Sequence, residues 1–319
     1  MKNFLSRAVS LIAFTLAALL LFAPLTLGAT LARLALVMPR PAAMPGTVGY
    51  FLVDCAPFQN VVATGKATAD LNSLVGRTVD RIILTLGGGA LTKTMLTNIR
   101  LLANEKVIFE DTGLRTDDRM EYRGETSAAT ALILDFNEAR AASIAMQHAG
   151  GLDTNSAGIK KLSLEVDIAG ATTPTLSAQA LVSRSPYSGD PLYNALLAKV
   201  MQKTFNPGGA GEFLFPVTFS RAMFSQIKRM HLFGATVTAA RVKTNEDIFK
   251  ATDAQNDFIQ TDWGRVPQAN VFTIDFCPDG NISDALRLQD WPTIEWYMTV
   301  SGAGNVTAVT ELLDPLANN

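Results

Sequence analysis

The sequence contains few residues of the types that build metal sites and disulfide frameworks. In 319 residues it has two cysteines, Cys55 and Cys277, and two histidines, His148 and His231. A thiolate-rich zinc site needs four ligands drawn mainly from these residue types, and no CxxC or HxxxH spacing occurs. A single cysteine pair cannot staple a chain of this length. We therefore expect neither a metal site nor a disulfide framework.

Charge is also scarce, and neither sign dominates. Charged residues make up 18% of the chain and hydrophobic residues 48%, and the formal net charge is −2. A disordered chain needs low hydrophobicity and high net charge, so this class is excluded. A nucleic-acid-binding protein neutralises phosphates with a basic surface, and these totals give no sign of one. We expect no direct contact with nucleic acid.

Local patterns of enzymatic chemistry are weak. Gly87-Gly88-Gly89 lacks the Gly-Lys-Ser/Thr close of a phosphate-binding loop, which favours a tight turn after a strand. Asp117-Asp118 with Glu121 is interpreted as a solvated helix face. No GxSxG elbow occurs. The sequence identifies no catalytic, cofactor-binding or metal-binding residue, and we expect that the chain is not an enzyme.

One acidic cluster has oxygen atoms of the kind that bind Ca²⁺. Its members are Asp275, Asp279, Asn281 and Asp284. Their spacing does not follow the calcium-loop motif, and Pro278–Asn281 is a strong turn sequence. We interpret the cluster as a turn and expect no cofactor, with a structural calcium ion as the alternative.

The N-terminal segment differs in composition from the rest of the chain. No charged residue lies between Arg7 and Arg33. A secretory signal peptide would use Leu11–Ala23 as its hydrophobic region. A membrane-seeking helix would use the same uncharged run, which reaches the ~20 residues that span a bilayer. A start site at Met38 or Met44 would remove the segment, and all three interpretations stay open.

Beyond residue 46 the pattern is typical of an all-β protein. In Lys161–Ile168 polar and apolar residues alternate strictly, which puts one face of a strand on a core and the other toward solvent. Short strands with turn residues between them favour a sandwich or a barrel. The runs that we expect to be strands are 78–86, 99–103, 106–110, 131–136, 161–168 and 175–182.

The strand pattern occurs twice along the chain. The matched segments are Asp80–Leu84 with Lys228–Leu232 (148 positions apart), Asn104–Ile108 with Asn245–Phe249 and Tyr122 with Trp263 (both 141 apart), and Leu134–Phe136 with Ile274–Phe276 (140 apart). A single match of this kind would carry little weight, because such turns are common in hairpins. Several matches in one order at nearly one offset predict two copies of one β-sandwich.

Helices are expected in each copy and between the copies. The equivalent helix-prone stretches are 114–122 and 253–262, and Asp253 is placed to cap the second. Between the copies, Asp190 and Pro191 have the residue types of a helix start. Apolar residues then recur on one helical face at Leu192, Leu196 and Val200. We expect a helix that connects the two sandwiches.

The repeated Asn-Glu turns and the strands around them resemble a known family. The residues that carry the resemblance are Val79–Gly88, Ile99–Leu101, Asn104–Ile108, Leu152–Thr154, Leu164–Gly170, Ala180, Asp275-Phe276 and Glu295-Trp296. They resemble the major capsid proteins of tailless, membrane-containing icosahedral phages of the corticovirus and finnlakevirus type. These belong to the double-jelly-roll lineage shared with adenovirus. The resemblance spans about residues 47–313, and the duplication is its strongest part.

The resemblance implies an all-β fold of two tandem eight-stranded antiparallel jelly rolls with short helices. Residues 1–46 would be an apolar segment with a hydrophobic N-terminal helix, 47–206 the first jelly roll plus the connecting helix, and 207–319 the second jelly roll. The implied function is a major capsid protein of the virion, self-assembling as pseudo-hexagonal trimers into an icosahedral shell over an internal membrane. Implied partners are the chain itself, neighbouring trimers, vertex (penton) and membrane proteins, and lipid through the N-terminal segment. No catalytic residue is implied.

Two other function classes stay open on the sequence alone. A secreted or envelope-associated carbohydrate-binding or adhesion protein would use Trp263, Trp291 and Trp296 as a sugar platform, although core or inter-sheet packing is the favoured explanation of such aromatics. A β-sandwich enzyme would assemble its site from distant residues. The duplication favours the coat protein, because two fused sandwiches give the large lateral faces that self-assembly needs.

Overall fold

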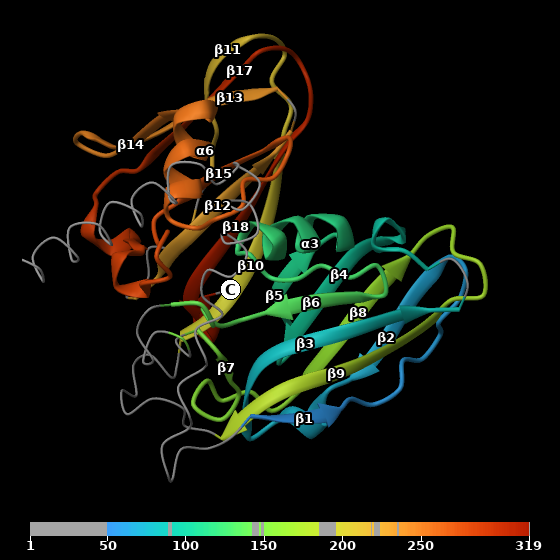
Figure 1. Ribbon diagram of the computed structural model, residues 1–319. Helices are drawn as coiled ribbons and strands as arrows, with labels where there is room; N and C mark the ends of the chain where they lie inside the picture. Colours follow the sequence, from blue (N-terminus) through green and yellow to red (C-terminus); the bar gives the residue numbers. More distant parts are fainter. Residues whose placement is uncertain are drawn as a thin grey trace, which may run out of the picture. The chain divides into compact units, whose positions relative to one another are not determined.

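The fold is seen in a computed structural model that describes residues 50–88, 91–141, 147, 150–184, 196–217, 219, 224–234 and 236–318. Residues 49–319 form one compact unit of strands with two α-helices and short 3-10 turns in its described part (Figure 1). The expected N-terminal helix lies outside the described residues. None of the helices in the described ranges is long and apolar enough to cross a membrane.

The first half of the unit consists of two four-stranded antiparallel sheets. One has the order β1-β9-β3-β6 and the other β2-β8-β4-β5. Most consecutive strands alternate between the two sheets, which winds them into a jelly roll and leaves few free edges. The elements are β1 (Phe51–Asp54), β2 (Gly65–Asp70), β3 (Arg77–Gly87), β4 (Leu96–Ala103), β5 (Lys106–Asp111), α3 (Gly113–Tyr122), β6 (Ala131–Asp135), β7 (Leu152–Asp153, paired with β3), β8 (Leu162–Ile168) and β9 (Thr175–Arg184).

The second half repeats this order strand for strand. Its sheets are β10-β18-β12-β15 and β11-β17-β13-β14, and the small β16 pairs with β12 as β7 pairs with β3. The elements are β10 (Leu196–Phe205), β11 (Gly211–Leu214), β12 (Gln226–Phe233), β13 (Val237–Lys243), β14 (Asp247–Thr252), α6 (Asp253–Asp262), β15 (Val271–Asp275), β16 (Leu286–Arg287), β17 (Glu295–Val300) and β18 (Val306–Pro315). The prediction of two tandem eight-stranded jelly rolls is confirmed.

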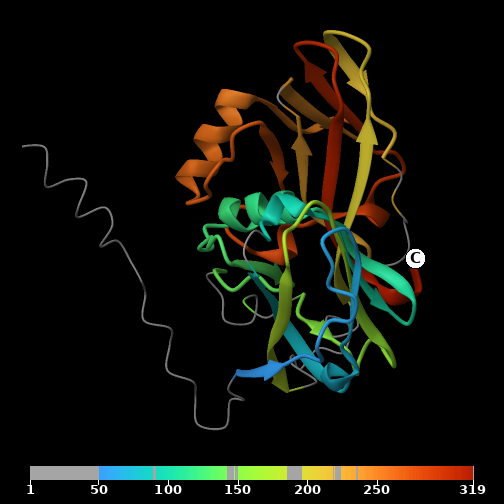
Figure 2. The ribbon, with the colours of Figure 1, turned by 90° about the vertical axis from the view of Figure 1, so that its right-hand side faces the viewer.

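The two jelly rolls lie side by side and share one sheet (Figures 1 and 2). Strand β5 of the first pairs in parallel with β10 of the second, with Phe109 opposite Val200. This contact joins the sheets into one of nine strands. Val309 and Leu313 of β18 pack in the core of the first jelly roll, so the two halves bury apolar side chains together.

The capping residues of the two helices show which positions of the two jelly rolls are equivalent. The N-cap residues are Thr112 and Thr252 and the C-cap residues are Arg123 and Trp263, each pair 140 positions apart. The match of Tyr122 with Trp263 is therefore wrong by one residue. The expected Asp253 cap is also wrong: Asp253 is the first helical residue, and the N–H of Thr252 donates to Oε1 of Gln255 (3.1 Å) in a capping box.

The predicted connecting helix is wrong over Leu196–Phe205, which forms strand β10. Ten residues of β10 pair with β18. The first five residues of the strand are all buried, because the nine-stranded sheet is covered on both faces there. A strand buried on both faces shows no alternation of polar and apolar residues. The spacing of its leucines therefore resembles that of the apolar face of a helix. Residues 185–195, where the helix was expected to begin, lie outside the described residues.

Candidate functional site

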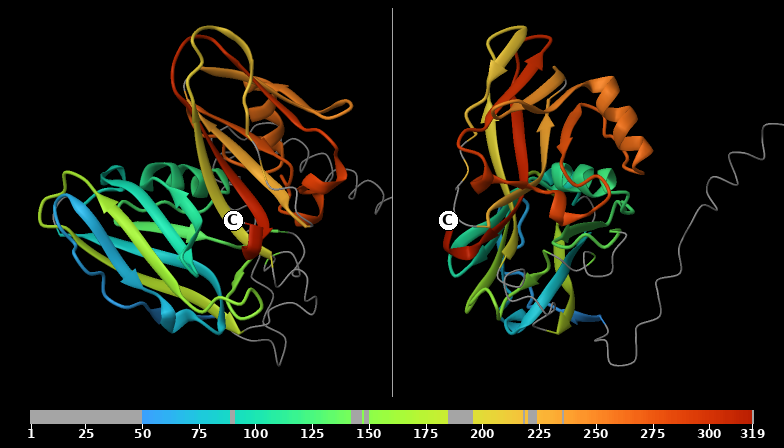
Figure 3. Two further views of the ribbon diagram at one scale, coloured as in Figure 1. Left: turned by 180° about the vertical axis from the view of Figure 1, so that it is seen from behind. Right: turned by 90° about the vertical axis from the view of Figure 1, so that its left-hand side faces the viewer.

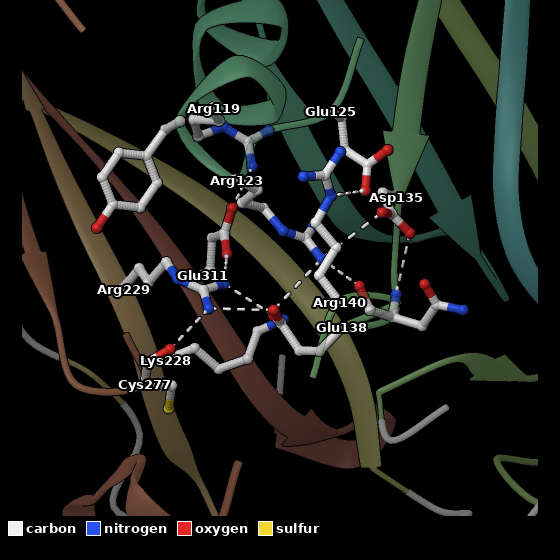
Figure 4. A network of polar contacts seen from close by, with 12 residues as sticks. Arg119, Arg123, Glu125, Asp135, Glu138, Arg140, Lys228, Arg229, Cys277 and Glu311 are labelled. Atoms are coloured by element: carbon white, nitrogen blue, oxygen red, sulfur yellow. Dashed lines mark hydrogen bonds and ion pairs between the residues drawn. The ribbon is translucent and has the colours of Figure 1, made fainter. Parts of the chain in front are cut away.

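A buried network of charged side chains lies where the two jelly rolls meet (Figure 4). Helix α3 and the segment after β6 bring side chains from the first jelly roll. Strands β12, β15 and β18 bring side chains from the second. On β12, Met230 and Leu232 point into the second core, so the alternation of the strand turns Arg229 and His231 toward the first jelly roll.

Arg229 is the centre of the network. Its Nη1 and Nη2 bind Oε1 and Oε2 of Glu138 at 2.8 and 3.1 Å. Its Nε binds Oδ2 of Asp275 at 3.0 Å, and its Nη1 also contacts Oε2 of Glu311 at 3.2 Å. A two-pronged arginine–carboxylate pair fixes both distance and orientation. Because Glu138 belongs to the first jelly roll, this pair holds the two halves in one arrangement.

Arg119 of α3 makes the reciprocal connection from the first jelly roll. Its Nε binds Oδ2 of Asp111 at 3.0 Å, and its Nη1 binds Oε1 of Glu311 on β18 at 2.8 Å. Lys228 adds a further bond across the junction, from Nζ to Oε1 of Glu138 (2.9 Å). Each half of the protein therefore supplies cations to carboxylates of the other half.

The buried charges of the network balance. The cations are Arg119, Arg123, Lys228, Arg229 and Arg265, and the carboxylates are Asp111, Asp135, Glu138, Asp275 and Glu311. A buried charge without a partner is strongly unfavourable, so all members depend on one another. The network ties the orientation of the two jelly rolls to complete pairing of these side chains.

Neighbouring cations keep two carboxylates of the network, Glu138 and Glu311, ionised. Burial alone would raise the pKa of Glu138, but Arg123, Arg229 and Lys228 outweigh burial and hold that pKa well below its ordinary range. The pKa of Glu311 is likewise held well below its ordinary value, against burial, by His231, whose Nε2 lies 3.7 Å from its Oε1, and by the neighbouring cations Lys228, Arg229 and Arg119. The pKa of Arg229 lies well above its ordinary value because three carboxylates outweigh burial. Glu138, Glu311 and Arg229 are therefore charged at neutral pH, whereas burial raises the pKa of Asp135 despite its neighbours Arg123 and Arg81.

His231 is a packing residue of this junction. Its Nδ1 lies 2.9 Å from Oγ1 of Thr273, and its ring makes an edge contact with Tyr122 of α3 at 5.3 Å between centroids. Burial lowers the pKa of His231, so the imidazole is neutral at neutral pH. The Tyr122 hydroxyl donates to Oδ2 of Asp275 at 3.0 Å. His148 lies outside the described residues.

One arginine–aspartate pair of the network is present in both copies. Arg81 stands opposite Asp135 in the β3–β6 register, and Arg229 stands opposite Asp275 in the β12–β15 register. Their N–O distances are 2.9 and 3.0 Å. In the first copy Glu125 completes the pair by binding Arg81 (2.9 Å). In the second copy the partner is Glu138 from the first jelly roll, described above.

The glycine run and the acidic cluster are turns. Gly88 follows β3 with φ +75°, and a Cβ there would collide with the carbonyl of Thr173, so the position requires glycine. Gly89 lies outside the described residues. In the acidic cluster, Oδ1 of Asp279 accepts from the N–H of Asn281 at 2.8 Å. The part of the chain that the structure describes contains no group of three or more His, Cys, Asp or Glu side chains arranged to hold a metal ion.

The remaining candidate residues are dispersed. Asp117 is not simply solvated, because it binds Nζ of Lys93 at 2.6 Å, and burial with nearby acidic groups raises the pKa of Asp118 to about 6. Trp296 is buried in the second core, whereas Trp263 is exposed on α6, so the expected sugar platform does not form. Cys277 is a free, buried thiol whose pKa burial raises to about 12.

Sequence analysis missed most of the network. The repeat search paired Asp80-Arg81 with Lys228-Arg229 and matched the two aspartates, so one duplicated ion pair carried a signal. Glu138, Glu311 and Arg119 have no equivalent charged partner in the other copy and stand in no motif. Only the docking of one jelly roll on the other brings them together.

Family models match nearly all of the described chain. Residues 52–183 match the viral coat protein P2 N-terminal domain, and residues 197–316 match the viral coat protein P2 C-terminal domain. No curated protein matches by sequence. The two matched ranges correspond to the two jelly rolls of the structure.

Solved structures of viral capsid proteins share the fold. The major capsid protein P2 of bacteriophage PM2 is similar with a TM-score of 0.72 at 19% identity, over 85% of this chain and 99% of that chain. The major capsid protein of Sulfolobus turreted icosahedral virus has a TM-score of 0.60 at 12% identity, over 84% and 97%. A PBCV-1 capsid chain has a TM-score of 0.55 at 12% identity, over 86% and 97%.

These matches agree with the duplicated jelly roll and with the predicted capsid function, and they do not support a carbohydrate-binding protein or an enzyme. The two jelly rolls of the chain match, in order, the two domains of one coat protein. The chain belongs to the viral coat protein P2 family and is a double-jelly-roll major capsid protein of the virion.

Proposed function

We propose that this coat protein assembles as a homotrimer with a pseudo-hexagonal outline, and that such trimers tile the facets of an icosahedral shell over an internal membrane. The observation that carries the proposal is the equivalence of the two jelly rolls. Three chains with two equivalent lobes present six similar lobes around one axis. The buried network supports this role, because a regular ring needs the two lobes of each chain in one fixed arrangement.

The proposed division of the chain follows the same logic. Residues 1–46 form an apolar segment, and the two jelly rolls follow, with β10 assigned to the second because it pairs along its length with β18. We propose that the apolar segment contacts the lipid membrane, since burial of apolar side chains contributes about 25 cal/mol per Å². Vertex and membrane proteins of the virion are proposed as further partners, and contact with nucleic acid is not.

The test is the assembly state of the purified full-length chain. Light scattering coupled to gel filtration is expected to give a mass of three chains, and electron microscopy is expected to show particles with six lobes. A chain that stays monomeric at every concentration would contradict the proposal. Deletion of residues 2–44 is expected to leave trimers intact and to reduce the lipid content of assembled particles; unchanged lipid content would contradict the membrane role alone.

A further inference from the structure

The two jelly rolls place the same helix in opposite surroundings. Counted from the caps, Ile259 and Trp263 of α6 stand where Arg119 and Arg123 stand in α3. Arg119 is 1% exposed and lies against the second jelly roll, whereas Ile259 and Trp263 are 50% and 54% exposed. The helix that reaches the other jelly roll within the chain does so with a buried arginine, and its equivalent in the second jelly roll has exposed apolar side chains at the same positions.

The exposed apolar side chains of α6 and the turn after it form one surface, the α6 patch. Its members are Phe258, Ile259, Trp263 and Val266, and Phe258 is 75% exposed. The N–H of Val266 donates to the carbonyl of Tyr122 (3.0 Å), so the patch continues to the C-terminal end of α3. Figure 2 shows both helices on the same side of the protein. Several exposed large apolar residues on one helix are typical of an interaction site.

Two apolar pairs lie on the outer face of the β1-β9-β3-β6 sheet, beside the Arg81–Asp135 pair described above. This sheet is the first copy's equivalent of β10-β18-β12-β15, whose strands carry the partners of Arg119 and Tyr122 of α3. Arg229 stands opposite Glu311 in the second copy, and the equivalent Arg81 stands opposite Leu181. Leu181 therefore occupies the place of Glu311, and Ile83 occupies the place of His231.

Each of these two residues has an apolar neighbour on an adjacent strand, while Gln179 of the same face donates to Oδ1 of Asp54 (2.8 Å). Ile133 of β6 stands opposite Ile83, and Leu52 of β1 stands opposite Leu181. All four side chains are at least partly exposed, and Leu52 is 53% exposed. We call Leu52, Ile83, Ile133 and Leu181 the sheet patch. Where Arg119 of α3 meets Glu311 within the chain, the equivalent Ile259 of α6 would meet Leu181 on this surface, next to Arg81.

The exposed edge strands of the two jelly rolls are independent evidence that these surfaces contact each other. Within the chain, β10 covers β5, and Phe109 is 1% exposed. The equivalents are β14 and β1, which end their sheets, and Phe249 is only partly buried. Strand β1 also exposes Phe51 (45%). An exposed apolar edge strand is normally covered, because it otherwise pairs with other chains.

We propose that α6 and β14 of one copy pack on the β1-β9-β3-β6 sheet of a second copy, with Ile259 against Leu181. This repeats between chains the junction that joins the two jelly rolls within a chain, with apolar side chains in place of the Arg119–Glu311 pair. The inference rests on the proposed self-assembly and names the surfaces that perform it. The contact is head-to-tail, so it closes into a ring when three copies complete the rotation.

The experiment places an arginine–glutamate pair, like the Arg119–Glu311 pair within the chain, at the proposed contact between chains. The variants are Ile259→Arg, Leu181→Glu and the double variant, and the matched control is Leu214→Arg. Leu214 is 57% exposed on β11, at the opposite end of its sheet from β14. Gel filtration with light scattering over a range of concentrations measures association, and circular dichroism checks folding. Each single variant is expected to weaken association at least tenfold, and the double variant and the control are expected to form trimers.

The outcomes separate this inference from the proposed function. Single variants that form trimers like the wild type would overturn the contact. Dissociated single variants without recovery in the double variant would overturn the pairing of Ile259 with Leu181. A wild-type chain that stays monomeric at every concentration would contradict the proposed trimer itself. Should Leu181→Glu fail to fold, Trp263→Glu, at an exposed position, is expected to dissociate the trimer, and an intact trimer would contradict the inference.

Discussion

The helices α3 and α6 show how one fold serves two kinds of junction. They share their length, a threonine N-cap and their position in the jelly roll, but α3 crosses to its neighbour with Arg119 and α6 presents Ile259 to solvent. A buried charged junction specifies one geometry and fails when a partner is missing. It suits two halves that fold together in one chain. An apolar surface tolerates exposure before assembly and suits contact between finished subunits.

The largest expected effect comes from breaking the charged junction. Arg229→Met leaves Glu138, Asp275 and Glu311 buried without their central cation. We expect the free energy of unfolding to fall by about 3–5 kcal/mol, measured by urea denaturation. The control is Arg241→Met, whose ion pair with Glu212 is partly exposed and contributes below about 1 kcal/mol. Equal losses in the two variants would contradict the role given to the network.

A second comparison uses the equivalent phenylalanines of β5 and β14. Phe109→Ala empties a fully buried site and is expected to lower the free energy of unfolding by about 3–5 kcal/mol. Phe249→Ala is expected to lower it by less than half as much, because Phe249 is partly exposed in a single chain. Both are measured by urea denaturation in the Ile259→Arg background, where the chain is expected to be monomeric. Equal losses would mean that β14 is already covered within one chain.

A third comparison concerns Asp80, which stands where the second copy has Lys228. Burial raises the pKa of Asp80 to about 6, despite a hydrogen bond from Asn137 (3.0 Å). Because this pKa lies above the unfolded value of about 3.9, the stability linked to Asp80 is present below pH 4 and is lost as the pH rises through 6.

Asp80→Asn removes the buried charge and is expected to raise the free energy of unfolding by about 3 kcal/mol at pH 8, and by little at pH 4. Asn keeps an oxygen that accepts the bond from Asn137. The measurement is urea denaturation of both proteins at the two pH values. A gain of the same size at both pH values would show that burial of the ionised carboxylate is not its cause.

The smallest expected effect concerns the helix caps. Oγ1 of Thr112 accepts from the N–H of Arg115 (3.3 Å), and Oε1 of Gln255 accepts from the N–H of Thr252. Thr112→Ala and Gln255→Ala are each expected to lower the free energy of unfolding by about 0.5–1 kcal/mol, read from thermal denaturation. Exposed Thr238→Ala on β13 serves as the control. A cap variant as stable as the control would show that its helix end is satisfied without that side chain.

The sequence contained enough local information to predict the repeated unit. Alternation over Lys161–Ile168 predicted β8 to within one residue, and the stretch 253–262 coincides with α6. The duplicated aspartates were found because Asp135 and Asp275 close equivalent strands. These features depend on spacing within one copy, which a sequence displays directly.

The features that were missed depend on contacts between the copies. Strand β10 imitated a helix because the nine-stranded sheet buries both of its faces. Glu138 and Glu311 are far apart in the chain, and they bind the same arginine only when one jelly roll docks on the other. The buried network therefore required the structure, whereas its duplicated Arg–Asp pair did not. Figure 3 shows the two lobes from two further sides.

The most direct test of the central claim is an electron cryo-microscopy reconstruction of the assembled protein. The account predicts that α6 of each copy packs on the β1-β9-β3-β6 sheet of the next, with Ile259 against Leu181 and the Arg119–Glu311 pair intact inside each chain. An assembly in which Ile259 and Trp263 stay exposed to solvent would contradict the claim that the junction within the chain is repeated between chains.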